Sequence, residues 1–207
     1  MQEKFFIKDG IGIDEVGKGA LAGPVVACAT LFNSEIIPSF LMEIGVDDSK
    51  ALTPKKRCII NEILMTLASK GCLSYGIGVI SASYVDEYGI TMATNNAMQQ
   101  ALIAINSPNR LILVDGIVNP FKEMSLNVET VVKGDSKCYN IAAASIIAKV
   151  FRDKIMDNLS VNEDQCYNWS KNKGYHSTEH MKGISYKGLS LHHRQSFCKK
   201  LISNNSN

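Results

Sequence analysis

Short runs of apolar and β-branched residues recur along the chain and predict β-strands. Five such runs occupy residues 7–14, 24–31, 73–80, 111–114 and 128–132. In the first run apolar and polar positions alternate loosely, as in a strand with one covered face. The run at 111–114 is unbroken and apolar, which is typical of a strand covered on both faces. The pattern therefore predicts a sheet with a buried centre.

Three longer segments have their apolar residues at helical spacing. The first begins at Thr53-Pro54, a pair typical of a helix N-terminus, and runs to about Ser69. The second covers residues 84–106, and the third, which is rich in alanine, covers residues 141–159. Strands and helices that alternate in this order predict a single α/β domain over residues 1–207, with a frayed tail at 203–207.

The composition indicates a folded core and excludes several classes of protein. Of the 207 residues, 45% are hydrophobic and 20% are charged, which excludes a disordered or collagen-like chain. The longest nearly apolar stretch, residues 22–32, is shorter than the ~18 residues of a membrane helix, and no apolar signal segment opens the chain. We therefore expect a soluble, cytoplasmic protein without a membrane partner. Its six cysteines include no Cys-x-x-Cys pair and are expected to be free thiols.

The net charge of +2 conceals a segregation of charge along the chain. Residues 171–207 carry seven basic residues, a single acidic residue and all four histidines, whereas acidic residues outnumber basic ones in the rest of the chain. A basic C-terminal part, at about 171–200, favours a polyanionic partner such as a nucleic acid. A solvated basic surface without a partner explains the same pattern equally well.

Four acidic residues lie where predicted elements end or begin. Asp14 and Glu15 end the first strand, Asp115 directly follows the apolar run at 111–114, and Asp135 precedes the third helix. Ligands of α/β folds bind at the carboxyl ends of strands, and carboxylates gathered there repel one another until a cation binds. Oxygen ligands favour Mg²⁺ or Mn²⁺, and two such ions about 4 Å apart can hold the attacking and leaving oxygens of a phosphodiester. Taken singly, each acid is also explained as a turn residue or a helix cap.

Gly17-Lys18-Gly19 follows the first acidic pair and is a short basic turn flanked by glycines. Glycines let backbone N–H groups approach a phosphate or a sugar closely, and the lysine adds a positive charge beside them. The turn is neither a Walker loop nor a dinucleotide-binding fingerprint, because the other glycines of those motifs are absent. By itself it is a weak indication of an anion contact.

These residues belong to a longer series of motifs. The run Gly12–Ala27 (GIDEVGKGALAGPVVA) resembles the opening motif of the type 2 ribonucleases H, the ribonuclease HII family. Further matches follow in the family's order: Asp48–Lys50, Leu113–Gly116, Lys133–Lys137, Ala142–Asp153, Lys173–Tyr175 and Leu191–Phe197. The resemblance spans essentially the whole chain, and so many ordered motifs do not arise by chance.

The resemblance implies a ribonuclease H-like fold, in which helices flank a mixed five-stranded sheet and the C-terminal part is helical. It implies a metal-dependent endoribonuclease that cleaves the RNA strand of RNA–DNA hybrids. It also implies incision at ribonucleotides embedded in duplex DNA, with 5′-phosphate and 3′-hydroxyl ends on the products. The implied partners are these two nucleic acids, the implied cofactor is Mn²⁺ or Mg²⁺, and we expect a monomer.

The resemblance also assigns roles to matching residues. Four carboxylates would bind the metal and carry catalysis: Asp14, Glu15, Asp115 and Asp135. The backbone of Gly17, Lys18 and Gly19 would contact the ribonucleotide 2′-hydroxyl, the group that separates RNA from DNA. Tyr175 would stack on the adjacent sugar. Three further residues, with part of the basic tail, would hold phosphates: Lys50, Ser136 and Lys149.

Three features depart from the family pattern. Lys18 stands where the family usually has an arginine, and lysine cannot make the two-pronged contact of a guanidinium with a phosphate. Asn172 replaces the first histidine of the family's His-x-Gly-Tyr pattern, which puts a role of that histidine in doubt here. Ten residues follow Phe197, so we expect the longer C-terminal extension that some relatives use for docking to be missing.

Two alternative interpretations stay open. A type 3 ribonuclease H shares the Asp-Glu-Val-Gly start, but that family usually carries a separate domain before the motif, and only 13 residues precede Asp14. A non-catalytic module that binds RNA–DNA hybrids would gain nothing from four carboxylates facing phosphates.

Several other polar residues are interpreted as structural. Asp153 lies four residues after Lys149, so the two are expected to form an ion pair on one helix face. The histidines His180, His192 and His193 are expected on the surface, where they add to the basic field. Trp169 is expected to serve packing.

Overall fold

A computed structural model describes residues 4–33, 38–162 and 165–203. Its centre is a five-stranded sheet with the strand order β3-β2-β1-β4-β5. The strands are β1 (Ile11–Val16), β2 (Val25–Phe32), β3 (Leu73–Ile80), β4 (Ile112–Asp115) and β5 (Val128–Val131). The first three strands are antiparallel neighbours, whereas β4 runs parallel to β1 and β5 runs parallel to β4. The mixed five-stranded sheet is therefore confirmed.

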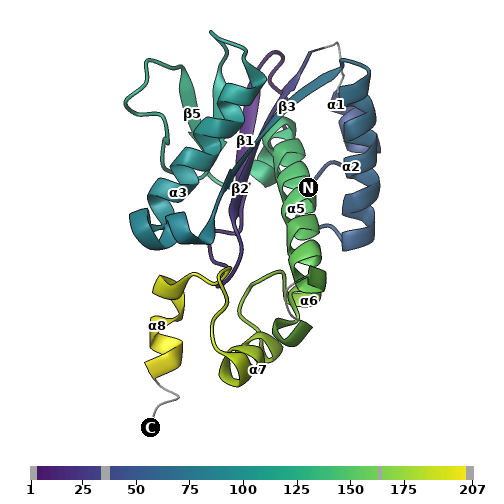
Figure 1. Ribbon diagram of the computed structural model, residues 1–207. Helices are drawn as coiled ribbons and strands as arrows, with labels where there is room; N and C mark the ends of the chain where they lie inside the picture. Colours follow the sequence, from purple (N-terminus) through teal and green to yellow (C-terminus); the bar gives the residue numbers. More distant parts are fainter. Residues whose placement is uncertain (1–3, 34–37, 163–164, 204–207) are drawn as a thin grey trace.

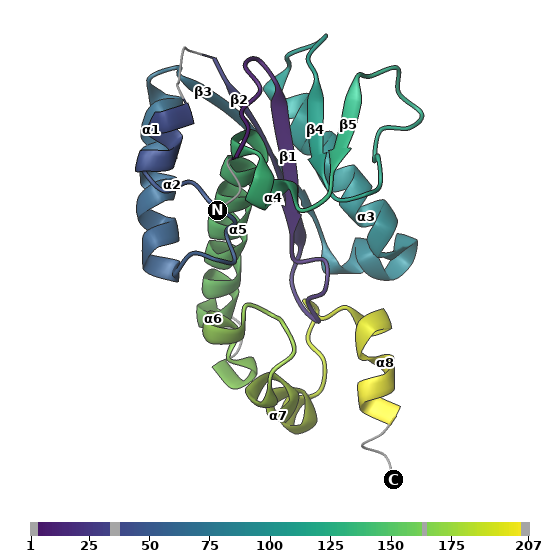
Figure 2. The same cartoon turned by 180° about the vertical axis from the view of Figure 1, so that it is seen from behind.

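Helices cover both faces of this sheet (Figures 1 and 2). One face carries α1 (Pro38–Glu43), α2 (Pro54–Ser69) and α5 (Tyr139–Asn162), and the other carries α3 (Ala82–Ile105). The short helix α4 (Gly134–Lys137) leads from β5 into α5. Beyond one end of the sheet lie the 3₁₀ turn Gln165–Tyr167, α6 (Trp169–Asn172), α7 (Thr178–Lys187) and α8 (Gln195–Ser203). The C-terminal part is helical, as expected.

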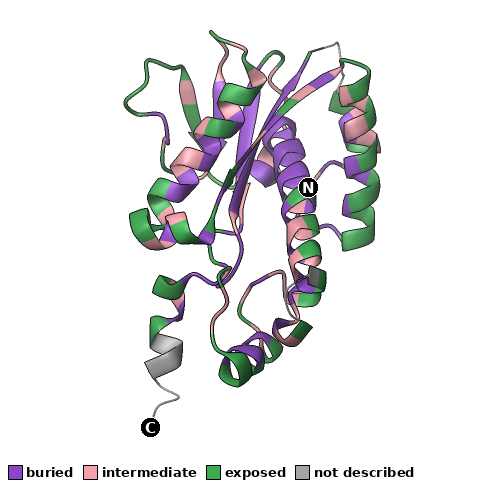
Figure 3. Ribbon diagram, viewed as in Figure 1, coloured by how far each residue is buried: buried purple, intermediate pink, exposed green. Residues whose placement is uncertain are grey.

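The core consists of two main apolar layers, one on each face of the sheet (Figure 3). All eight residues of β2 are buried, so this strand is covered on both faces. The layer under α5 depends on a close approach of that helix to β1. A Cβ atom on Gly12 would lie 2.2 Å from the carbonyl carbon of Asn140, so glycine is required where the strand and the helix meet. This contact places the start of α5 beside the residues that follow Gly12.

The start of β1 differs from the prediction, because the strand begins at Ile11 and not at Ile7. Residues 7–10 form a turn in which Asp9 has a φ of 60°. The side chain of Asn140 holds this turn, since its Oδ1 accepts from the Ile7 N–H (3.1 Å) and its Nδ2 donates to the Gly10 carbonyl (2.9 Å). Hydrogen bonds from Asn140, far along the chain, thus keep residues 7–10 out of the strand that the local pattern predicts there.

The three long helices begin and end within a few residues of the prediction, but α3 is interrupted at Gly89, whose φ of 83° is not helical. Thr53 caps α2 by accepting from the Lys56 N–H (3.3 Å), and a serine missed in the sequence, Ser81, caps α3 by accepting from the Tyr84 N–H (3.2 Å). The third helix, α5, is longer than predicted at both ends. The short helices α1, α4 and α6 were not predicted, because segments of four to six residues carry no helical periodicity.

Other expectations can be compared directly with the described residues. All six cysteines are free thiols, and Cys28, Cys138 and Cys198 are buried. Of the frayed tail predicted at 203–207, residues 204–207 lie outside the described residues. Among the described helices, none combines the length and the apolar character that crossing a bilayer requires.

Candidate active site

Three aspartates from different segments meet at one edge of the sheet. Asp14 lies in β1, Asp115 ends β4, and Asp135 lies in the first turn of α4. One carboxylate oxygen from each lies within 4.8 Å of the others. Because β1 and β4 are parallel neighbours, paired at Ile13 and Val114, their next residues stand side by side. The predicted gathering of these three acids is therefore present.

Backbone N–H groups hold two of these carboxylates in place. The Gly134 N–H donates to Asp115 Oδ1 at 2.6 Å, and the Glu15 N–H donates to Asp14 Oδ1 at 2.7 Å. Gly134 opens α4, the helix that also carries Asp135, so a single short helix aligns both acids. The aspartates are thus oriented by backbone geometry, and the cluster does not depend on long, flexible side chains.

The electrostatics of the cluster are unfavourable without a cation. Asp14 is only 3% exposed, and burial together with the charges of Glu15 and Asp115 raises its pKa well above the ordinary value. Burial and the charge of Asp115 also raise the pKa of Asp135, although Lys50 opposes this shift. Several carboxylates that repel one another in a poorly solvated site favour either a proton or a cation between them.

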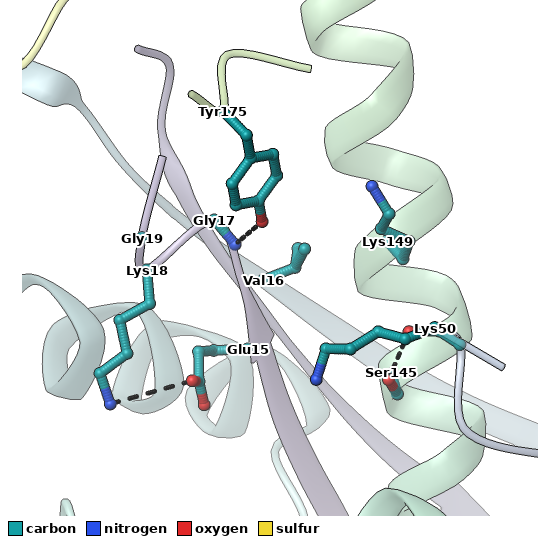
Figure 4. A pocket seen from close by; sticks show the side chains of 10 residues that line it. Glu15, Val16, Gly17, Lys18, Gly19, Lys50, Ser145, Lys149 and Tyr175 are labelled. Carbon is teal, nitrogen blue, oxygen red and sulfur yellow. Dashed lines mark hydrogen bonds and ion pairs between the residues drawn. The ribbon is translucent and has the colours of Figure 1, made fainter. Parts of the chain in front are cut away.

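Glu15 lies beside the cluster but is not gathered into it as tightly. Its Oε1 is 3.9 Å from Lys18 Nζ, and Figure 4 shows the two side chains reaching toward each other. Burial raises the pKa of Glu15, and the nearby ammonium of Lys18 lowers it. As a fourth metal ligand Glu15 stays a prediction.

Lys50 is the basic residue that approaches the cluster from the other side. Its Nζ lies 3.7 Å from Asp135 Oδ2, and Asp14 and Asp135 raise its pKa against the effect of burial. A buried guanidinium holds its loop, because Arg57 donates to the carbonyls of Ser49 (2.8 Å) and Leu52 (2.9 Å). Lys50 is therefore positioned to meet a charged ligand at the acidic edge.

The donor set of this site fits a hard divalent cation. The three residues offer carboxylate oxygens only, and no histidine or cysteine joins the cluster among the residues that the structure describes. Oxygen-only sites of this kind suit Mg²⁺ or Mn²⁺, whereas Zn²⁺ sites usually include nitrogen or sulfur ligands. Burial, followed by the charges of Glu15 and Asp115, raises the pKa of Asp14, and a bound cation would offset both effects.

A pocket of about 400 Å³ opens next to the acids (Figure 4). Its lining combines the glycine-flanked turn with basic and aromatic side chains, and it includes Glu15, Gly17, Lys18, Gly19, Lys50, Lys149 and Tyr175. A second pocket of about 480 Å³ is lined by Lys50, Asp115, Lys133, Asp135 and Ser136, among others. The two pockets share Lys50, so the residues predicted to bind substrate surround the acidic cluster on both sides.

The turn at Gly17 adopts a conformation that requires glycine. Gly17 has a φ of 92°, and a Cβ there would lie 2.3 Å from the Nε of Arg152. Its N–H donates to the hydroxyl of Tyr175 at 3.1 Å (Figure 4). The tyrosine therefore meets the turn although 158 residues separate the two in the chain.

The segment after this turn is hydrogen-bonded to the C-terminal part. The N–H groups of Leu21 and Ala22 donate to the Gly174 carbonyl (2.8 and 3.1 Å), and the Gly23 N–H donates to the carbonyl of His192 (2.8 Å). In return, the Arg194 N–H donates to the carbonyl of Leu21 at 2.7 Å. The C-terminal part thus forms one wall of the site.

Two buried arginines were missed as site residues in the sequence. Arg152 and Arg194 are fully buried and donate to backbone carbonyls, Arg152 to those of Ala22, Pro24 and Lys173 and Arg194 to those of Lys18 and Gly23. The guanidinium of Arg152 also lies 5.2 Å from the ring centre of Tyr175. Both residues occur in motifs of the resemblance, but nothing local indicates that these side chains turn inward.

The remaining predicted site residues, Lys149 and Ser136, have partners inside the protein. Lys149 Nζ donates to Asp153 Oδ1 at 2.6 Å, which confirms the ion pair, and Arg57 joins it 3.6 Å from the other oxygen. Lys149 lines the first pocket, 5.9 Å from the ring centre of Tyr175. The hydroxyl of Ser136 donates to the Lys133 carbonyl at 2.8 Å, inside α4.

The expectation of surface histidines was wrong for two of the three. His180 is fully buried and His193 is 2% exposed, and both pack against Trp169, whose predicted packing role is confirmed. Their ring nitrogens find partners inside the protein, so burial costs them little. Asn172 also has a structural task, because its Oδ1 accepts from the Gly174 N–H at 2.9 Å.

Comparisons with known proteins agree with this architecture. The sequence model of the ribonuclease HII family matches residues 11–200. The ribonuclease HII of Ehrlichia chaffeensis is 42% identical over 187 residues, which cover 90% of this chain and 84% of that protein. Among solved structures, the ribonuclease H2 of Pyrococcus horikoshii has a TM-score of 0.74 at 24% identity, covering 96% of this chain and 99% of that one. The structure of Bst-RNase HIII in complex with Mn²⁺ has a TM-score of 0.71 at 20% identity, covering 96% and 70%.

The two solved structures support the ribonuclease H-like fold, and the sequence matches go further. The family match covers most of the chain, including the three clustered aspartates and the glycine-flanked turn. The chain therefore belongs to the ribonuclease HII family and is a ribonuclease H, a hydrolase that acts on the RNA of RNA–DNA hybrids.

Proposed function

We propose that this ribonuclease H also incises duplex DNA at single embedded ribonucleotides and leaves 5′-phosphate and 3′-hydroxyl ends. In this proposal Asp14, Asp115 and Asp135, together with Glu15, hold Mg²⁺ or Mn²⁺. The observation that carries it is the cluster of three aspartate oxygens within 4.8 Å of one another beside a glycine turn suited to reading a sugar. All these residues come from one chain, so we expect a monomer to suffice, with residues 1–207 acting as one domain.

The carboxylates bring acceptor oxygens to the point where the phosphodiester must lie. A divalent cation bound there would polarise the phosphate and increase the acidity of the attacking water. Because Asp14 and Asp135 are buried, their oxygens are oriented before substrate arrives, and few water molecules compete for them. Water adds to phosphorus while the bond to the 3′ oxygen breaks, so the phosphate stays on the 5′ end of the downstream product.

The turn at Gly17–Gly19 is proposed to recognise the 2′-hydroxyl. This group both donates and accepts hydrogen bonds, so it can engage a backbone N–H and a tyrosine hydroxyl together. The Gly17 N–H and the hydroxyl of Tyr175 already lie 3.1 Å apart and offer such a pair. A Cβ on Gly19 would meet nothing within 4 Å, so the missing side chain leaves open space for the sugar. DNA, which lacks the hydroxyl, would gain none of these contacts.

Positive charge around the pocket is proposed to hold the flanking phosphates. Lys50 and Lys149 line the pocket from two sides, and Lys18 lies at its rim with about half of its side chain exposed. Ser136 and the basic part at 171–200 extend this surface. An arginine could make two parallel hydrogen bonds to one phosphate, whereas Lys18 offers a single ammonium group. We therefore expect Lys18 to fix the orientation of the phosphate less strictly.

Incision of a DNA duplex that contains one ribonucleotide tests this function. With Mn²⁺ or Mg²⁺ present, we expect a single nick on the 5′ side of the ribonucleotide, which end-labelled substrate and denaturing electrophoresis would detect. An all-DNA duplex of the same sequence and a reaction with EDTA are the controls, and neither should be cut. Cleavage of long hybrids without this nick would contradict the proposal and favour activity of the type 3 kind. Binding without any cleavage in several metals would support the non-catalytic module.

Replacement of Tyr175 by alanine is expected to lower kcat/KM for the embedded ribonucleotide about 10-fold more than for a long hybrid. An aromatic contact with a nucleotide contributes about 1–3 kcal/mol, and a single ribonucleotide offers no alternative register to compensate for its loss. The measurement compares both substrates at equal metal concentration.

Tyr175→Phe is the matched variant for this prediction. It keeps the ring and removes only the hydroxyl that accepts from Gly17, so we expect it to lie between the wild type and Tyr175→Ala. Equal losses of Tyr175→Ala on both substrates would show that the ring does not select the junction.

A further inference from the structure

The C-terminal part contains a buried polar group that the site described above does not use. His180 in α7 and His193, in the segment between α7 and α8, lie against each other with their Nε2 atoms 3.1 Å apart. Trp169 Nε1 lies 3.0 Å from the same Nε2 of His180. We call His180 and His193 the histidine pair. Both are at most 2% exposed, so their ring nitrogens depend on partners inside the protein.

The partners of His180 determine which of its nitrogens carries the proton. Its Nδ1 lies 2.8 Å from the carbonyl oxygen of Tyr175, which can only accept, so Nδ1 must be protonated. The indole N–H of Trp169 can only donate, so the Nε2 of His180 must present its lone pair. His180 is therefore neutral, with its proton on Nδ1.

The same logic extends to His193. A backbone N–H, that of Ser190, points at its Nδ1, so Nδ1 accepts and the proton of the neutral ring is on Nε2, which shares the lone pair of His180 with Trp169. The Ser190 N–H lies 2.9 Å from this Nδ1, and the Ser190 hydroxyl lies 3.0 Å from it. The donors therefore run in one direction, from Ser190 to His193, from His193 to His180, and from His180 to the carbonyl of Tyr175.

We propose that the histidine pair is a positioning device for Tyr175, which it holds through the carbonyl of that residue. This inference rests on the proposed role of Tyr175 in junction recognition. Tyr175 is otherwise held by its hydroxyl, which accepts from Gly17, by its own N–H, which donates to the Asn172 carbonyl at 2.9 Å, and by Arg152 near its ring. The pair anchors the backbone end, so the ring direction is set from both ends.

Burial keeps both members of the pair neutral. It lowers the pKa of His180, and it lowers that of His193 to about 4, with the nearby His180 contributing to the second shift. A second proton on His180 would place an N–H against the N–H groups of Trp169 and His193. The pair therefore serves as two fixed donor–acceptor links at neutral pH.

A double-mutant experiment tests whether the pair acts through Tyr175. The readout is the ratio of kcat/KM for an embedded ribonucleotide to that for a long hybrid, which a general loss of folded protein leaves unchanged. We expect His193→Leu to lower this ratio about fivefold. In a Tyr175→Ala background the same change should leave the ratio unaltered. Where Tyr175→Ala itself lowers the ratio, an unchanged ratio in His193→Leu, or an equal fall in both backgrounds, overturns the proposal.

Two further variants separate positioning from simple loss of stability. His193→Gln keeps an N–H near the place of Nε2, so it should restore most of the ratio. Tyr167→Phe removes a hydrogen bond to the Gly188 carbonyl (3.0 Å) in the same small core but keeps the ring, whose centre lies 4.7 Å from that of His193, so it should leave the ratio unchanged. A fall of the ratio in Tyr167→Phe would indicate that any damage to this core has the same effect.

A spectroscopic measurement keeps the test independent of the role of Tyr175 in substrate choice. At pH 7 the long-range ¹H–¹⁵N spectrum of the wild type should show one buried histidine protonated on Nδ1 and another protonated on Nε2. His193→Leu should shift the ring resonances of Tyr175, whereas His193→Gln and Tyr167→Phe should leave them close to those of the wild type. If these shifts occur while Tyr175→Ala leaves the substrate ratio unchanged, the positioning holds and the proposed role of Tyr175 fails. The same tautomer in both His180 and His193 would contradict the proposed direction of the hydrogen bonds.

Discussion

Asp14→Asn is expected to reduce hydrolysis of RNA–DNA hybrids by about 1,000-fold or more while binding of the hybrid persists. Asp14 is the most buried of the three clustered aspartates and lies between Glu15 and Asp115, so its charge is central to any cation held there. Asparagine has nearly the same shape and keeps an oxygen that can accept from the Glu15 N–H. Single-turnover cleavage and fluorescence-anisotropy binding, both with Mn²⁺, measure the two effects separately.

The same substitution is expected to stabilise the metal-free protein at neutral pH by about 1–2 kcal/mol. Because the native pKa of Asp14 is raised, its contribution to stability is complete below the ordinary pKa of an aspartate and is lost as the pH rises through the native pKa. The advantage of Asp14→Asn should therefore be present at pH 7 and should disappear on acidification. Saturating Mn²⁺ should reverse the order, because the cation stabilises the wild type more.

Urea unfolding at several pH values, with EDTA or Mn²⁺, checks this reversal. Loss of binding to the same extent as activity would instead mean that Asp14 maintains the fold. A metal-free variant less stable than the wild type at pH 7 would show that burial and repulsion of the Asp14 charge are not the main effects of this residue.

Gly12→Ala is expected to destabilise the protein by about 3 kcal/mol or more. The new Cβ would lie 2.2 Å from the carbonyl carbon of Asn140 and 2.5 Å from the Ile141 nitrogen, both in the backbone of α5. A helix backbone cannot move aside as the end of a flexible side chain can, so β1 and α5 must separate. Asp14 lies two residues further along β1, so activity should fall together with the midpoint of urea unfolding.

Gly19→Ala is the matched control, since it makes the same chemical change where a Cβ would meet nothing within 4 Å. We expect its free energy of unfolding to stay within about 0.5 kcal/mol of that of the wild type. If Gly12→Ala unfolds at the same urea concentration as Gly19→Ala, the contact between β1 and α5 is looser than the structure indicates.

Much of the fold was predictable because it follows from local patterns. The apolar runs marked all five strands. The start of the helix over Pro54–Ser69 was predicted because Thr53 and Pro54 are specific start signals. The start of β1 was wrong because Asn140, remote in the chain, holds residues 7–10 in a turn. Local patterns cannot report a hydrogen bond from a side chain of another element.

The acidic site was predictable for a related reason. Asp115 ends β4 as predicted, whereas β1 continues two residues past Asp14 to Val16, so the predicted end of that strand at Asp14 and Glu15 was slightly too early. The carboxyl ends of parallel neighbours meet at one edge of a sheet, which still brings the two acids together. The sequence does not state that β4 lies beside β1, because β1 pairs on its other side with β2, the strand next in the chain. The family resemblance implied only that these acids share one metal site, and it also pointed to Tyr175.

By itself the sequence determined the five strands, the three long helices, the acids near the strand ends and the family, because each follows from the order and spacing of neighbouring residues. Only the tertiary structure decided that Arg152 turns inward to hold carbonyls and that His180 and His193 are buried against each other. The local sequence does not show whether an arginine or histidine side chain is solvated or buried. Its environment is set by segments distant in the chain, and so is its chemical role.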